Sequence, residues 1–129
     1  MSIIYLDVET IPAQRADVVA WMAAKALAKG ESPEDSAKTY RASSLSPVLG
    51  ELVVVSLAIG DNEPITYVRD MTISTGECDL VVRVCQDLVD IYEEDRIHRI
   101  VAHNAAFDRT VIRTRAMVHG AKLPYGVHG

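Results

Sequence analysis

Two acidic residues near the start of the chain, Asp7 and Glu9, have the residue types and spacing that metal-dependent chemistry uses. They follow the apolar run 3–6, which predicts a β-strand covered on both faces. Side chains two positions apart on a strand point to the same face, so both carboxylates should project together. No lysine or arginine precedes Arg15 to neutralise them. Such a pair suits Mg²⁺ or Mn²⁺, which prefer oxygen ligands, whereas an early strand end would leave both acids simply solvated.

A second group of polar residues lies at 101–108, where an apolar strand is expected to turn through His103 and Asn104 into a helix. Asp108 falls in the first turn of that helix and is the only acidic residue after Asp95. An acid at this position either stabilises the helix dipole or serves as a third metal carboxylate beside the first strand. Phe107 fits a core position, although an aromatic side chain there could also stack on a terminal base.

The remaining elements decide whether these residues can meet. Apolar runs and turn signals predict strands at 3–6, 52–59, 65–69 and 99–103, the second and third forming an antiparallel hairpin. Helices are expected at 15–29, after Ser32, at 77–94 behind a capping box of Ser74 and Glu77, and between Asn104 and Gly120. This order predicts an α/β domain with a mixed sheet and a helical insertion at 13–45. The insertion is an ordinary packing helix, a cover over the site on the first strand, or a surface that uses Trp21 and Met22 to associate with a second copy.

Composition limits the class of protein. The chain has 129 residues, of which 49% are hydrophobic and 24% charged, which fits one folded domain. No apolar run reaches the roughly 18 residues that a membrane span needs, and no signal peptide is expected. Cys78 and Cys85 fall in one predicted helix, about 10 Å apart along its axis, so we expect both to be reduced. A cytoplasmic setting follows from this expectation.

Charge is unevenly distributed along a chain whose formal net charge is −5. Residues 96–129 contain six lysine or arginine residues and one acid, whereas residues 51–95 contain two basic and eleven acidic residues. The basic C-terminal part is therefore either a surface for an anionic ligand or a solvated basic helix.

The two groups of polar residues together resemble a known family. The segment Tyr5-Leu6-Asp7-Val8-Glu9-Thr10 is similar to the first motif of the DEDD (DnaQ-like) 3′–5′ exonucleases, which have the ribonuclease H-like fold. The segment Val101-Ala102-His103-Asn104, with Phe107-Asp108, is similar to their second motif. The resemblance implies a single exonuclease-like domain over residues 1–129, with a ribonuclease H-like mixed sheet flanked by helices. It further implies metal-dependent hydrolysis at the 3′ end of single-stranded DNA or RNA.

The resemblance also assigns roles to individual residues. Asp7, Glu9 and Asp108 would be the catalytic carboxylates that hold two Mg²⁺ or Mn²⁺ ions for an in-line displacement. Contacts to the nucleic acid would come from the other residues of the motifs and the basic helix: Thr10, His103, Asn104, Phe107, Arg109 and Arg113, with Arg115 also near the backbone.

The chain departs from the family at its third motif, which supplies a last aspartate and a His or Tyr general base. No acidic residue follows Asp108, and His119 and His128 lack a partner acid. We expect His119 to interact with the last carbonyls of its helix. The expected domain is therefore C-terminally truncated and weakly active, with a bare sheet face near Asp7 that invites self-association or a protein partner. The alternative is a catalytically inactive module that binds nucleic acid or protein.

Overall fold

A four-stranded mixed sheet forms the centre of the computed structural model, which describes residues 3–95, 99–102 and 104–124. The strands are β1 (Ile3–Ile11), β2 (Glu51–Ile59), β3 (Ile65–Val68) and β4 (Arg99–Ala102), in the order β3-β2-β1-β4. Strand β1 is antiparallel to β2 and parallel to β4, and β2 and β3 form the expected antiparallel hairpin. The predicted α/β class and the mixed sheet are confirmed.

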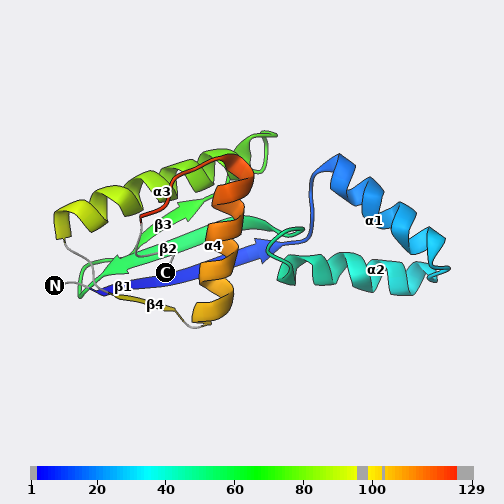
Figure 1. Ribbon diagram of the computed structural model, residues 1–129, viewed down its shortest axis with the longest axis horizontal. Helices are drawn as coiled ribbons and strands as arrows, with labels where there is room; N and C mark the ends of the chain where they lie inside the picture. Colours follow the sequence, from blue (N-terminus) through cyan, green and yellow to red (C-terminus); the bar gives the residue numbers. More distant parts are fainter. Residues whose placement is uncertain (1–2, 96–98, 103, 125–129) are drawn as a thin grey trace.

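Two helices, α3 (Gly76–Asp95) and α4 (Ala105–His119), lie over the sheet (Figure 1). The apolar stripe predicted on α3 is buried, because Val81, Val84 and Leu88 pack in one core with residues of the sheet and of α4. Helix α4 ends at Gly120, whose φ of 67° is the left-handed conformation that glycine adopts readily. The core therefore lies between one face of the sheet and these two helices.

Strand β1 is buried on only one of its faces. Ile4 and Leu6 belong to the core, whereas Tyr5 between them is 46% exposed. Val68 of β3 is also exposed, and it pairs with Val54, the β2 partner of Glu9. The expectation that β1 is covered on both faces was wrong, because α3 and α4 pack on the same side of the sheet. Among the described residues, the face that carries Tyr5, Asp7 and Glu9 stays open, as expected for a bare sheet face.

Residues 13–45 form a helical hairpin of α1 (Ala16–Ala28) and α2 (Pro33–Ala42), followed by a short 3-10 turn at Ser43–Leu45. The hairpin projects beyond the end of the sheet at which β1 finishes (Figure 1). Helix α2 begins as its sequence predicts, because the Ser32 hydroxyl accepts a hydrogen bond from the Asp35 amide. Ala26 is the buried residue of α1, and α2 buries none.

Polar contacts at its base join this hairpin to the sheet. The Tyr40 hydroxyl donates to the Ala13 carbonyl at 2.8 Å, and the Ala13 amide donates to the Ser43 hydroxyl at 3.1 Å. The Thr10 hydroxyl of β1 donates to the Ser44 carbonyl at 2.6 Å. These bonds fix where the hairpin leaves the sheet, whereas its far end lies away from the core.

The structure also bears on the two cysteines and on the expected absence of a membrane span. Cys78 and Cys85 are both free thiols, as expected, and burial raises the pKa of Cys85 to about 11. Over the residues that the structure describes, no helix is both long and apolar enough to cross a bilayer.

Candidate functional site

The two motif segments meet at one end of the sheet. Leu6 and Ala102 are the last paired positions of the parallel strands β1 and β4. Beyond this pair, β1 continues through Asp7 and Glu9, and β4 leads into the first turn of α4 with Asn104 and Asp108. Parallel strands bring residues that follow them to the same edge. The fold therefore places the two segments as neighbours although about 95 positions separate them along the chain.

Asp7 and Glu9 project from the open face of the sheet. Both are exposed, and they alternate with Leu6 and Val8, which face the core. Asp7 pairs with Ser56 of β2, and Glu9 with Val54, so no charged side chain lies opposite either one on that strand. Neither carboxylate forms a hydrogen bond or ion pair with any residue that the structure describes. Two neighbouring, solvated carboxylates fit hydrated Mg²⁺, which uses one or two carboxylates together with waters and substrate phosphates.

Asp108 has a different environment. It is 4% exposed and lies one turn before Val111 and Ile112, which belong to the core. Its carboxylate is therefore on the sheet-facing side of α4, whereas Asp7 and Glu9 project from the opposite face of the sheet. Within the described part of the chain, no three His, Cys, Asp or Glu side chains group closely enough to hold a metal ion. The structure thus brings together Asp7 and Glu9 but does not group Asp108 closely with them, and the role of Asp108 as a shared ligand stays a prediction.

The residues expected to contact nucleic acid are scattered. Thr10 uses its hydroxyl to bond the hairpin at Ser44, and Phe107 packs against the core, the first of its two expected roles. Asn104 is exposed at the start of α4, but its side chain makes no capping hydrogen bond. His103 lies outside the described residues. Asn104 is therefore the most solvent-exposed of the described residues in this group.

The arginines of α4 do not form one basic surface. Arg109 and Arg113 are half-buried, and Arg109 lies near Tyr92 of α3. Burial raises the pKa of Tyr92, and the positive charge of Arg109 offsets part of that rise. Arg115 is 3% exposed, so the expectation that it meets a nucleic-acid backbone was wrong. It faces inward because it shares the apolar side of α4 with Val111 and Ile112.

A buried ion network explains the position of Arg115. Its guanidinium forms a 2.5 Å ion pair with Glu77 Oε1 and also donates to the Val48 carbonyl at 2.8 Å. The Glu77 carboxylate further accepts from the Leu52 amide at 2.6 Å, and His119 Nε2 lies 2.6 Å from it. The network joins α3, α4, β2 and the loop before β2.

Glu77 is therefore no capping-box residue, and that expectation was wrong. Burial raises the pKa of its carboxyl, but hydrogen bonds from Arg115 and His119 outweigh burial and hold the pKa below its usual value. His119 likewise contacts Glu77 instead of the last carbonyls of its own helix. The signal for this network was an arginine on the apolar stripe of a helix, because such a charge needs a buried partner.

A second buried carboxylate holds the base of the hairpin. Glu51 Oε2 accepts from the amides of Gln14 and Arg15 at the start of α1, at 2.7 and 3.1 Å. Its other oxygen forms a 2.8 Å ion pair with Arg69, and both side chains are over 90% buried. Glu51 thus occupies the N-terminal end of α1 as an internal anion. Sequence patterns did not reveal this role, because Glu51 reads as the polar start of a strand.

Comparison of the chain with protein-family models, with curated proteins and with solved structures gave no match.

Proposed function

We propose that this chain is a metal-dependent 3′–5′ exonuclease domain of the DEDD type with a ribonuclease H-like sheet. Its substrate is the 3′ end of single-stranded DNA or RNA, and its cofactor is Mg²⁺ or Mn²⁺. The two free thiols fit the reducing cytoplasm, where we place this activity. The observation that carries the proposal is the placement of Asp7 and Glu9. They are adjacent, solvated and without a cationic partner among the described residues, at the edge where the second motif begins.

The strand order supports this proposal independently of the carboxylates. The first motif lies on a central strand, β1, between an antiparallel neighbour and a parallel one. The parallel neighbour then leads directly into the helix of the second motif. A mixed sheet flanked by helices is compatible with the ribonuclease H-like arrangement that the resemblance implies.

Each residue of the proposed site has a limited task. A bound divalent ion would supply Lewis acidity and a more acidic water for attack on the phosphodiester. Asp7 and Glu9 would hold that ion at the open face, where a substrate phosphate can complete its shell. Asn104, exposed at the start of α4, would donate to the backbone of the incoming strand.

A nuclease assay on matched variants tests this proposal. A 3′-labelled single strand is incubated with the protein and Mn²⁺, and release of labelled nucleotide is followed. We expect slow release that Asp7→Asn or Glu9→Gln lowers at least about tenfold, since even residues one shell beyond a metal change its affinity by about 10–100-fold. Asp61→Asn, which removes an exposed acid from the β2–β3 turn, should leave the rate unchanged. Equal rates in all four proteins would contradict the proposal, because the cleavage would then come from elsewhere.

One observation favours a second function, that of an inactive module which binds nucleic acid or protein. Among the described residues, Asp7 and Glu9 are not joined by a third metal-ligating side chain. Such a module would bind a labelled single strand without Mn²⁺ and release no nucleotide with it. Binding without Mn²⁺ together with no release of nucleotide would favour the inactive binding module over the exonuclease.

A further inference from the structure

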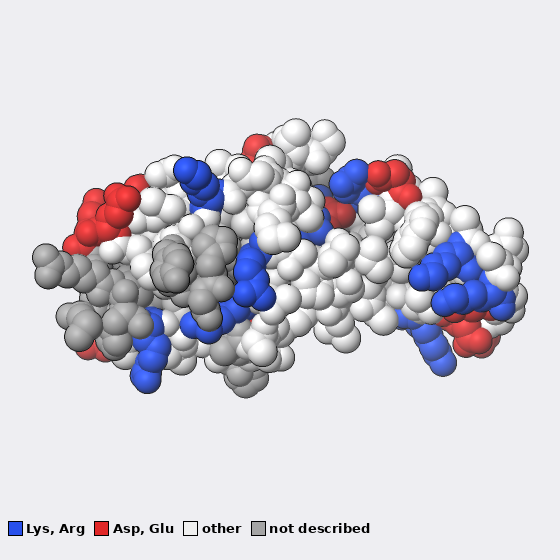
Figure 2. Space-filling view, viewed as in Figure 1, with Lys and Arg blue, Asp and Glu red and all other residues white. Residues whose placement is uncertain are grey.

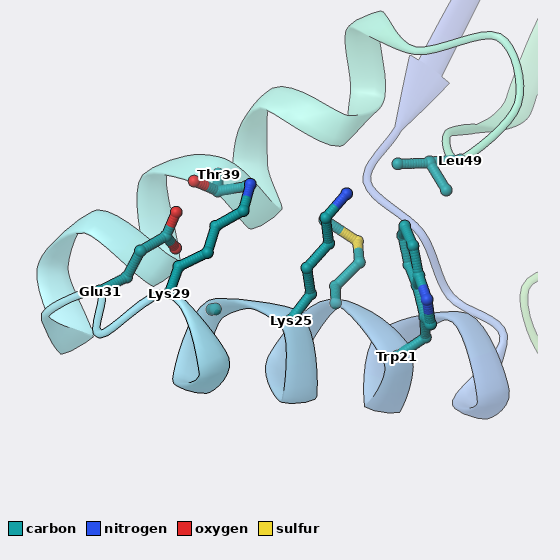
Figure 3. Close-up of a pocket in the computed structure, with 8 residues that line it drawn as sticks. Trp21, Lys25, Lys29, Glu31, Thr39 and Leu49 are labelled. Carbon is teal, nitrogen blue, oxygen red and sulfur yellow. The ribbon is translucent and has the colours of Figure 1, made fainter.

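Helix α1 carries an aromatic and basic stripe on the hairpin, far from the carboxylates of β1. Trp21, Lys25 and Lys29 are four positions apart, so they lie one above the other on the same side of the helix. Together they line one side of a groove whose other walls include Thr39 of α2 and Leu49. In Figure 3 the side chains of Trp21 and Lys25 rise from α1 into this groove, and so does that of Lys29, the residue that follows the helix. We call these three residues the α1 stripe.

The indole of Trp21 is available to a ligand. It is 52% exposed although tryptophan is a large apolar side chain that folding usually buries. Lys25 Nζ lies 4.8 Å from the centre of the ring and covers one of its faces. A second hollow, lined by Asp17, Val18 and Leu49, borders Trp21 as well. A flat ring placed there would stack on the indole beside the lysine.

The two lysines supply positive charge to a groove that Glu31 also lines. Over the described residues, no Asp or Glu oxygen lies within ion-pair distance of Lys25 or Lys29. Figure 2 shows lysine and arginine side chains over the α1–α2 hairpin, with acidic side chains among them, on a protein whose net charge is −5. Glu31 lies at the end of the groove opposite Trp21 (Figure 3). The charge and the aromatic ring together select a ligand that is anionic and also presents flat rings.

We propose that the α1 stripe binds single-stranded nucleic acid, with a base stacked on Trp21 and backbone phosphates at Lys25 and Lys29. Aromatic side chains beside a basic groove are the general means of holding a single strand without sequence preference. A duplex keeps its bases stacked inside and offers none to Trp21. The stripe needs no metal ion, so this inference stands apart from the exonuclease proposal.

Trp21 is the only tryptophan of the chain, so its fluorescence reports on this site alone. The test titrates the whole protein with oligothymidylate in EDTA, which removes any metal-dependent contribution. We expect saturable quenching that weakens as salt rises. Trp21→Ala should lower the affinity, measured by anisotropy of a labelled strand, about 5- to 150-fold, the equivalent of about 1–3 kcal/mol for one stacked base.

Charge variants separate the stripe from other basic surfaces. Lys25→Gln with Lys29→Gln should reduce the slope of log affinity against log salt by about 1.4, since each contact to a single strand accounts for about 0.7. Lys38→Gln removes an exposed lysine of α2 outside the groove and should leave the slope unchanged. Asp61→Asn should bind as tightly as the wild type, and the EDTA in this test separates it from the Mn²⁺-dependent nuclease assay. Circular dichroism confirms that each variant is folded.

Four results would overturn the proposal. They are no quenching by oligothymidylate, equal quenching by heparin (a polyanion without bases), an unchanged slope in the double lysine variant, and equal binding of a duplex. A change in Trp21 emission with protein concentration alone would assign the stripe to contacts between copies of the chain instead.

Discussion

The sheet with α3 and α4 and the hairpin of α1 and α2 are stabilised in different ways. The first region, the body, contains the apolar core and the buried pair of Glu77 and Arg115. The hairpin buries almost no side chain along its helices and depends on hydrogen bonds at its base. Its surface exposes Trp21, and Leu27 is 82% exposed.

This difference indicates where each kind of function can reside. A region with a dense core holds side chains in fixed positions, which the proposed metal-binding carboxylates on β1 would require. A region held only at one end can adjust to a flexible ligand and can open locally without unfolding the rest. The proposed chemistry therefore lies on the body, and the proposed capture of a strand lies on the hairpin.

The largest effect should come from breaking the buried ion pair of the body. Arg115→Ala leaves the carboxylate of Glu77 buried without its main partner, which should lower the free energy of unfolding by about 3–5 kcal/mol. Arg41→Ala, the same change at an exposed position of α2, should cost less than about 0.5 kcal/mol. Urea titration followed by circular dichroism measures both. Similar losses in the two variants would remove the distinction between body and hairpin.

The next largest effect concerns apolar packing in the two regions. Leu88→Ala on α3 removes a side chain that is 1% exposed, and should cost about 2–5 kcal/mol through lost burial and a cavity. Leu27→Ala on α1 removes an exposed side chain and should change stability by no more than about 0.5 kcal/mol. Thermal unfolding of both variants provides the comparison. A large loss for Leu27→Ala would show that the hairpin packs on something it does not contact in this structure.

The smallest effect is a pH dependence within the body. Because the folded state lowers the pKa of Glu77 below its ordinary value of 4.5, ionised Glu77 stabilises the protein above that pH. This contribution disappears as the pH falls through the lowered pKa. The stability difference between the wild type and Glu77→Gln should therefore be constant near neutral pH and shrink in acid. A difference that stays constant down to pH 3 would contradict the assigned pKa direction.

Local patterns predicted most of the helices and strands but few of the long-range contacts. Ser32 and Pro33 correctly predicted the start of α2. The apolar stripe of α3 predicted the length of that helix and the side that it buries. The partner of Glu77 could not be read in the same way, because Arg115 lies 38 positions away and only the packing of α4 on α3 brings them together. The sequence pattern around Glu77 was therefore interpreted as a capping box, whereas the residue belongs to a buried ion network.

The candidate site shows the same limit. The spacing of Asp7 and Glu9 correctly predicted two carboxylates on one face, because alternation along a strand is a local property. Whether Asp108 joins them depends on which side of α4 turns toward the sheet. Val111 and Ile112 decide that orientation by packing in the core, and Asp108 turns inward with them.

Calorimetric titration with Mn²⁺ of the wild type, the Asp7→Asn/Glu9→Gln variant and Asp61→Asn tests the assignment of the carboxylate pair most directly. We expect a Mn²⁺ site in the wild type and in Asp61→Asn that weakens at least about tenfold when the pair on β1 is neutralised. Equal Mn²⁺ affinity in all three proteins would contradict it, because Asp7 and Glu9 would then hold no ion.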